Sequence, residues 1–328
     1  MSRSTLAGWP TVNIPPLPPT NLNIDSSFTS WQERAAETLS TGRAAGERGL
    51  RFFTTSDGAR IAYRDEGEGT PLVLLHGLMA HGGFFREQHR LAERFRLIRI
   101  DLRGHGASAA VPGRPTVEQI AGDVADLAAA LDLEGAIGVG WSMGATILWH
   151  VLTGPAAARF AGAVVIDMTA RVLNDEGWDL GLSAEACDAR STAIRDDFER
   201  FAVDAGQGIF AQPVENGTRA LADWASFEFA RNDPDTIAAL WASLVRQDVR
   251  TLLERIQHPT LVVHGAQSRL YGEDTADHLV AALPNARAVR FDRSGHAPHL
   301  EQPELFNRSL TDFADRLFRG RAATTEVS

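Results

Sequence analysis

The chain has 328 residues, of which 44% are hydrophobic and 23% are charged, a composition typical of a globular protein with a sizeable core. Its formal net charge of −10 and the lack of a basic block argue against a nucleic-acid partner or an anionic membrane surface. The single cysteine, Cys187, excludes an intrachain disulfide, and no apolar run approaches the roughly 20 residues of a membrane span, so we expect a cytoplasmic protein.

We expect residues 1–48 to lie outside the folded core. Residues 14–19 read IPPLPP, and prolines at this density exclude a helix or an inner strand. The leader of about 26 residues is therefore either disordered or an extended arm on the domain or on a second subunit, which would make the protein a homodimer. In residues 27–46 apolar residues recur at helical spacing, so one helix could follow the arm.

From residue 50 onward, short apolar runs alternate with amphipathic segments. Residues 51–64 predict a hairpin with the turn Asp57-Gly58, and Thr116 is a suitable N-cap for a helix over residues 117–131. Strands that alternate with helices form a mostly parallel sheet covered on both faces, so the fold class is α/β. Further strands are predicted at 71–75, 96–100, 136–139, 163–167, 259–263 and 286–291, and further helices at 145–152, 275–283 and 304–318.

Residues 168–257 interrupt this alternation because they contain no convincing strand. They are rich in alanine and carry Trp178, Trp224 and Trp241, which predicts a helical cap over the carboxyl ends of the strands, where ligands bind in such sheets. The tryptophans could line a pocket or only fill the core of the cap. The predicted organisation is a core of residues 49–167 and 258–320, a cap of residues 168–257 and a disordered tail of residues 321–328.

The segment Gly140-Trp141-Ser142-Met143-Gly144 lies between a predicted strand and a predicted helix. The pattern G-x-S-x-G in this context is typical of a nucleophile elbow, a tight turn that exposes a strained serine, here Ser142. Small residues are needed at both ends because a Cβ at either position would crowd the strand-to-helix crossing. The helix N-terminus points backbone N–H groups at whatever the hydroxyl attacks.

A serine hydroxyl needs a base at neutral pH, and His296 is the best candidate because it follows the last strand in a loop opened by Ser-Gly. His299 is the nearby rival, which we expect to be structural. The oxyanion of an attacked carbonyl needs preset N–H donors. We expect these donors from Met143, directly after the nucleophile, and from Leu78, because Gly77 lets that loop approach the site.

Four motifs along the chain belong together: His76-Gly77, Asp101-Leu102-Arg103-Gly104-His105-Gly106-Ala107-Ser108, Gly140-Trp141-Ser142-Met143-Gly144 and Ser294-Gly295-His296. In this order and spacing they resemble the α/β-hydrolase superfamily over about residues 50–318. The chain is similar to its branch of capped esterases, lactonases, perhydrolases and C–C hydrolases. The resemblance implies Ser142 as nucleophile, His296 as base, and the N–H groups of Leu78 and Met143 as oxyanion hole.

The family usually places the acid after the next-to-last strand in a pattern like G-x-x-D, and the chain departs from this pattern. Ser268 occupies the expected position and has no charge to hold an imidazolium. Asp167 ends the strand after the nucleophile strand, at the same sheet edge, and some α/β-hydrolases place their acid there. A carboxylate that ends an apolar strand needs a partner, since burying it alone is costly, and His296 would supply one. We predict Asp167 as the acid; the alternatives are Asp274 or Glu273, or no acid.

Together these residues predict a serine hydrolase that cleaves a carboxylic ester or lactone with an apolar group through an acyl-enzyme on Ser142. Gly77 and Trp141 are expected to contact this small-molecule substrate. The alternatives are a C–C bond hydrolase or a cofactor-free perhydrolase resembling the haloperoxidases on the same triad, and a non-enzymatic ligand sensor. No cofactor and no metal are predicted, because the sequence has no H-E-x-x-H, no cysteine pair and no G-x-G-x-x-G after a strand.

Overall fold

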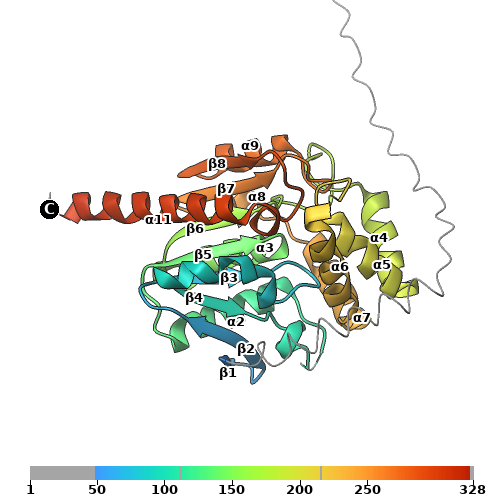
Figure 1. Ribbon diagram of the computed structural model, residues 1–328, viewed down its shortest axis with the longest axis horizontal. Coiled ribbons are helices and arrows are strands. Elements are labelled where there is room, and N and C mark those ends of the chain that lie inside the picture. Colours follow the sequence, from blue (N-terminus) through green and yellow to red (C-terminus); the bar gives the residue numbers. More distant parts are fainter. Residues whose placement is uncertain (1–48, 111–112, 215, 326–328) are drawn as a thin grey trace, which may run out of the picture. The chain divides into compact units, whose positions relative to one another are not determined.

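The computed structural model describes residues 49–110, 113–214 and 216–325. The arm, the helix and the dimer contact predicted for residues 1–48 lie outside these ranges and stay predictions. Within them one sheet has the strand order β1-β2-β4-β3-β5-β6-β7-β8 (Figure 1). β2 is antiparallel to β1 and β4, whereas the other neighbouring pairs are parallel, as predicted for an α/β fold. The strands are β1 (Leu50–Thr54), β2 (Arg60–Glu66), β3 (Thr70–Leu75), β4 (Phe95–Ile100), β5 (Ala136–Trp141), β6 (Phe160–Ile166), β7 (Thr260–Gly265) and β8 (Ala286–Phe291).

The burial of the strands follows their apolar content. Every residue of β5, β6 and β7 is buried, as expected for continuous apolar runs covered on both faces. At the edge, the hairpin of β1 and β2 turns at Gly58, whose φ of +86° favours glycine and whose N–H donates to Thr55 O at 2.9 Å. The functional loops therefore rest on a rigid central sheet.

Helices cover the sheet in two groups, within each of which the helices contact one another. One group is α2 (Val117–Ala130), α3 (Met143–Thr153), α8 (Arg250–Leu253) and α9 (Glu273–Ala282), which contact one another in sequence and reach β5, β7 and β8. The other group is the 3-10 segment η1 (Gly82–Glu93), α10 (Pro298–Glu301) and α11 (Pro303–Thr325), which reach β4, β6 and β7. Short 3-10 turns η2 (Gly106–Ser108) and η3 (Ala157–Arg159) complete the core.

Two helix ends differ from the sequence predictions. Helix α11 continues to Thr325, so the disordered tail predicted for residues 321–328 is wrong for residues 321–325. The stretch begins with one arginine and two alanines, which are strong helix formers and outweigh the single glycine before it. Helix α9 begins at Glu273, and Gly272 is its N-cap. Glu273 and Asp274 therefore occupy the first turn, where their negative charges interact favourably with the helix dipole but do not cap the helix.

Residues 168–257 contain helices α4 (Ala184–Asp196), α5 (Phe198–Gly208), α6 (Asn216–Ala230) and α7 (Pro234–Val245), gathered at one end of the sheet (Figure 1). Side-chain N-caps define the starts of α4, α5 and α7; Asp233, for example, accepts the N–H of Thr236, and Pro234 takes the first helical position of α7. The connections between these helices contact the loop after β3 and helix α10: Asn232 Nδ2 donates to Met79 O at 2.7 Å, and Ala211 N donates to Glu301 Oε1 at 2.7 Å. The cap therefore lies over the carboxyl ends of the parallel strands.

Candidate active site

Ser142 occupies a strained turn between β5 and α3. Its φ of 54° and ψ of −123° lie in a region that non-glycine residues rarely adopt, as a nucleophile elbow requires. The backbone fixes this turn, because Ser142 N donates to Ile166 O at 2.9 Å and Ala145 N donates to Ser142 O at 2.8 Å. The strain is therefore held by the packed sheet and the helix on either side.

The two glycines of the elbow permit the close crossing of strand and helix. A Cβ at Gly140 would lie 2.5 Å from Gly144 O and 2.6 Å from Ala145 N. A Cβ at Gly144 would overlap the carbonyl oxygen of Leu75, at the end of β3. Neither neighbour can move, since both are backbone atoms inside the sheet-and-helix core, so the glycines have a steric role in placing Ser142.

The loop after β3 approaches Ser142 through Gly77. A Cβ at Gly77 would lie 3.1 Å from Ser142 Cβ, so the backbone here passes directly beside the predicted nucleophile. Leu78 follows, and none of the described residues accepts its N–H in a hydrogen bond. Met143 is the first residue of α3, so its N–H has no intrahelical partner. Neither of the two N–H groups predicted to form an oxyanion hole therefore has an acceptor among the described residues.

Two buried histidines hold the Gly77–Leu78 loop. His76 Nε2 accepts the N–H of Leu102 at 2.9 Å, and its Nδ1 donates to Gly77 O at 2.8 Å. His105 Nε2 accepts the N–H of Met79 at 3.1 Å. Burial lowers the pKa of His76 well below its ordinary value and that of His105 to about 4, so both rings are neutral at pH 7. Each ring can then accept from one N–H, which a doubly protonated imidazole could not do.

Asp167 and His296 are in direct contact. His296 Nδ1 lies 2.5 Å from Asp167 Oδ2, and both residues are buried, at 4% and 3% exposure. Asp167 adopts a φ of 46° directly after β6, and its N–H donates to Val263 O at 2.8 Å. The carboxylate that ends this apolar strand therefore has the imidazole partner that the sequence predicted.

Ser268 has a defined contact at the position where the family usually carries its acid. Its hydroxyl donates to Asp167 Oδ2 at 2.7 Å and accepts the N–H of Leu270 at 3.3 Å. The alternative acids lie elsewhere: Glu273 pairs with Arg290 at 3.0 Å, and Asp274 is exposed in the first turn of α9. The geometry therefore brings Ser268 to the Asp167–His296 pair and leaves Glu273 and Asp274 out of it.

Consecutive side chains at the end of α10 anchor the loop that carries His296. Glu301 Oε2 accepts the N–H of Gly295 at 2.7 Å, while Glu301 Oε1 accepts the N–H of Ala211 from the cap at 2.7 Å. Gln302 Oε1 accepts the N–H of Arg293 at 3.1 Å. Burial raises the pKa of Glu301 to about 7, opposed by these backbone hydrogen bonds. One carboxylate therefore joins the cap to the residue before His296.

Trp141 and His299 brace the site from inside the core. Trp141 is 1% exposed, its ring stacks on Phe84, and its Nε1 donates to His296 O at 2.8 Å. This placement favours a bracing role over the predicted contact with substrate. His299 is fully buried, and burial lowers its pKa to about 3, so it is neutral at pH 7 and fits the structural role expected for it.

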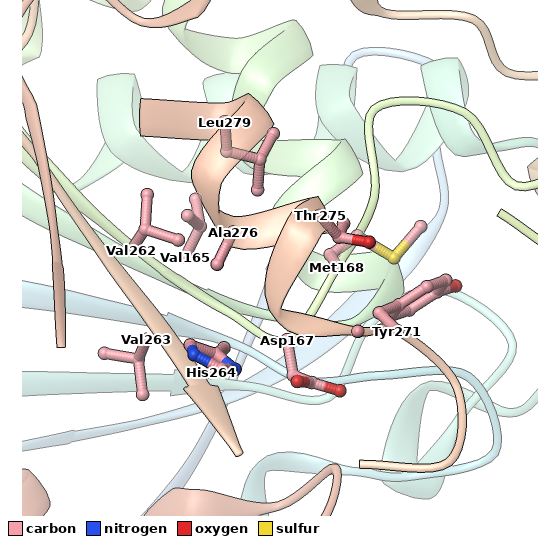
Figure 2. Close-up of a pocket in the computed structure, with 11 residues that line it drawn as sticks. Val165, Asp167, Met168, Val262, Val263, His264, Tyr271, Thr275, Ala276 and Leu279 are labelled. Atoms are coloured by element: carbon pink, nitrogen blue, oxygen red, sulfur yellow. The ribbon is translucent and has the colours of Figure 1, made fainter. Parts of the chain in front are cut away.

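A small cavity lies beside the Asp167 carboxylate, between β7 and α9 (Figure 2). Val262, Ala276 and Leu279 give it an apolar wall, with the His264 and Tyr271 side chains at the Asp167 end. Its volume of about 10 Å³ is near the lower limit for one water molecule, and neither Ser142 nor His296 lines it. The cavity is therefore too small to hold an ester.

Two contributors to this site were missed by sequence reasoning. Ser268 occupies the position where the family usually carries its acid, and this could have indicated that it lies close to Asp167. Its uncharged hydroxyl suggested instead that the residue has no role in the site. Glu301 gave no signal, because its contact with Ala211 joins segments 90 residues apart.

Among the described residues, no group of three His, Cys, Asp or Glu side chains is arranged to hold a metal ion, and every helix is too short or too polar to cross a membrane.

Comparison with known proteins places this geometry in a family. A family model described as the alpha/beta hydrolase family matches residues 72–309. The chain is 32% identical over 255 residues to the pimeloyl-(acyl-carrier protein) methyl ester esterase of Chromobacterium violaceum, covering 75% of this chain and 94% of that protein. It is 28% identical to the non-heme chloroperoxidase CPO-A1 of Kitasatospora aureofaciens, covering 81% and 100%. The solved esterase RhEst1 from Rhodococcus sp. has a TM-score of 0.72 at 28% identity, covering 82% and 99%. The chain belongs to the alpha/beta hydrolase family.

Proposed function

We propose that the protein is a serine hydrolase that cleaves a carboxylic ester or lactone with an apolar group, through an acyl-enzyme on Ser142. The observation that carries this proposal is the buried Asp167–His296 contact of 2.5 Å, in a chain whose Ser142 lies in a strained elbow. The esterases among the relatives support the same reaction class. The catalytic residues are Ser142, His296 and Asp167.

The geometry supports the following sequence of steps. His296 Nδ1–H donates to Asp167, which leaves Nε2 free to take the Ser142 proton as the hydroxyl attacks the carbonyl carbon. The N–H groups of Leu78 and Met143 stabilise the oxyanion of the tetrahedral intermediate. The His296 imidazolium then protonates the leaving alcohol, and a water activated by the same base releases the acid from Ser142.

Perhydrolysis on the same triad is the second candidate, because a non-heme chloroperoxidase is among the relatives. In that reaction hydrogen peroxide would replace water in the attack on the acyl-enzyme. A panel of p-nitrophenyl esters and lactones of graded length, with and without hydrogen peroxide, tests both candidates. Ester turnover that disappears in Ser142→Ala supports the proposal, and turnover that Ser142→Ala retains would overturn it.

C–C bond cleavage and a non-enzymatic ligand sensor stay as alternatives from the sequence. The sensor is the weaker one, because the strained turn at Ser142 and the Asp167–His296 contact are what a serine hydrolase would use. Labelling with a fluorophosphonate separates it from the enzymes, since only an activated serine reacts. We also keep the cytoplasm as the expected location.

A further inference from the structure

Leu78, the proposed oxyanion donor from the loop after β3, lies in a tight turn that contains a strained residue. Ala80 N donates to Gly77 O at 3.2 Å and closes the turn, so Leu78 and Met79 are its two central residues. Met79 is buried and has a φ of 64°. A turn with positive φ at its third position normally carries glycine or asparagine there, because other side chains make this conformation costly. Contacts around Met79 must therefore hold the turn in this form.

Two side chains hold the backbone polar groups of Met79, one from the core and one from the cap. His105, in the loop after β4, accepts the N–H of Met79 at its Nε2 at 3.1 Å. Asn232, which follows cap helix α6, donates from Nδ2 to the carbonyl oxygen of Met79 at 2.7 Å. Each peptide group that flanks Met79 is therefore fixed by one side chain, and the cap supplies one of these two hydrogen bonds.

A second contact holds the end of α6 against the same loop. His81 Nδ1 accepts the N–H of Gly83 at 3.0 Å, so the neutral ring carries its proton on Nε2. This Nε2 lies 3.2 Å from Oε2 of Glu228, a buried carboxylate in the last turn of α6. Glu228 precedes Asn232 by four residues, so the two side chains meet the loop at neighbouring positions, on His81 and on Met79. The contact of Asn232 is therefore part of a built junction between cap and loop.

We propose that Asn232 is a positioning residue for the oxyanion hole, so that the cap helps to set the rate of the chemical step. This inference rests on the proposed function, because it needs an oxyanion at the N–H groups of Leu78 and Met143. Such donors accelerate a reaction only if they are already in place when the charge develops. If Met79 relaxed to a negative φ while both ends of the turn stayed fixed, the peptide group between Leu78 and Met79 would have to rotate. Asn232 opposes this rotation from the cap, as a lid that completes a catalytic site does.

Asn232 also stabilises the end of its own helix, and the test has to separate the two roles. Its Nδ2 lies 3.2 Å from Glu228 O and 3.0 Å from Phe229 O, two carbonyl groups in the last turn of α6. Met79→Gly separates them, because glycine adopts a positive φ without steric cost. This change relieves the strain that Asn232 is proposed to hold, but it cannot replace hydrogen bonds at the end of α6.

The experiment is a double-mutant cycle of Asn232→Ala and Met79→Gly in the full-length enzyme, assayed with a p-nitrophenyl ester. Asn232→Ala should lower kcat by about 10- to 100-fold with little change in KM, since complete loss of one oxyanion donor costs about 10²- to 10³-fold. Affinity for an alkyl trifluoromethyl ketone, which forms a tetrahedral oxyanion adduct with an active serine, should fall by the same factor. In the Met79→Gly background the loss of kcat should be about 10-fold smaller, a coupling within the range of residues in contact.

Asn285→Ala is the matched control. Asn285 Nδ2 also donates to a backbone carbonyl, Gln257 O at 2.9 Å, but it directly precedes β8, at the opposite end of the strands from the site. This variant should keep the wild-type kcat and ketone affinity. If Asn232→Ala does not fold, Asn232→Asp takes its place, because an ionised aspartate has the same shape and no N–H to donate.

Two results would overturn the inference. One is wild-type kcat and ketone affinity in the Asn232 variant, and the other is an equal loss of kcat in both Met79 backgrounds, which would assign Asn232 to the support of α6 alone. Either result leaves the proposed function intact if Ser142→Ala abolishes turnover and ketone binding. Turnover that survives in Ser142→Ala would instead contradict the proposed function.

Discussion

We predict that the role proposed for Asp167 can be moved to position 268, because the Ser268 side chain already contacts the Asp167 carboxylate. Ser268 Oγ lies 2.7 Å from Asp167 Oδ2, which lies 2.5 Å from His296 Nδ1. A carboxylate at position 268 would extend toward the place that Asp167 Oδ2 occupies. We predict that Asp167→Asn combined with Ser268→Asp regains activity that Asp167→Asn alone has lost.

The expected gain in kcat follows from two effects: the cost of the wrong His296 tautomer and the cost of a misplaced carboxylate. Asp167→Asn should lower kcat by up to roughly 10⁴, because an amide that donates to His296 Nδ1 selects the wrong tautomer. A carboxylate at position 268 restores the acceptor but reaches His296 from a displaced origin, and a misplacement of about 1 Å costs about 10²-fold. The double variant should therefore turn over about 10²-fold faster than Asp167→Asn. Ser268→Asp alone should lose activity, since two adjacent carboxylates cannot both stay ionised.

The assay is kcat for a p-nitrophenyl ester, measured on the four proteins of the cycle after circular dichroism has established equal folding. Asp274→Asn is the control, because Asp274 is exposed and lies outside the Asp167–His296 contact. It should keep near wild-type kcat. A double variant no faster than Asp167→Asn would refute the geometric reasoning about position 268. Full activity in Asp167→Asn, with Asp274→Asn inactive, would refute the assignment of the acid itself.

Three further predictions concern the supports of the site. Gly77→Ala should lower kcat more than it lowers stability, because its Cβ would press on Ser142 Cβ from 3.1 Å; an unchanged kcat would argue against a loop placed this tightly. Trp224→Ala should change chain-length preference more than Trp241→Ala does, since Trp224 is half-buried against Phe84 whereas Trp241 is buried within the cap; equal losses on all esters, following the melting temperature, would favour a purely structural role. Glu301→Gln should remove a pH dependence of stability. The pKa of Glu301 is raised from 4.5 to about 7 in the folded protein, so its contribution to the free energy of unfolding falls as pH rises through this window. Urea unfolding of both proteins at pH 5 and pH 7.5 checks the sign, and parallel pH dependence would contradict it.

The fold could be predicted from sequence because its signals are local. Apolar runs gave the central strands, and the glycines around Ser142 indicated the elbow by steric need alone. The missing charge of Ser268 led to Asp167, whose contact with His296 is found at 2.5 Å. What could not be predicted depends on distant segments. Trp141 stands beside Ser142 in sequence, yet its ring packs on Phe84 in the core.

Long-range contacts also explain why the supporting residues escaped notice. Glu301 matters only because the cap brings Ala211 to the same carboxylate that accepts from Gly295. A sequence read alone gives residue types and local spacing, and such contacts become visible only when the three-dimensional arrangement is known.

Intact-protein mass spectrometry after mixing with a slowly released p-nitrophenyl ester tests the central claim most directly. The account predicts one added acyl group per chain in the wild type, on the peptide that contains Ser142, with release of one equivalent of p-nitrophenol in a burst. The acyl group should be absent from Ser142→Ala and should accumulate in a His296→Ala variant only slowly. An acyl adduct that persists in Ser142→Ala, or ester turnover with no adduct on the wild-type Ser142 peptide, would contradict a serine acyl-enzyme mechanism.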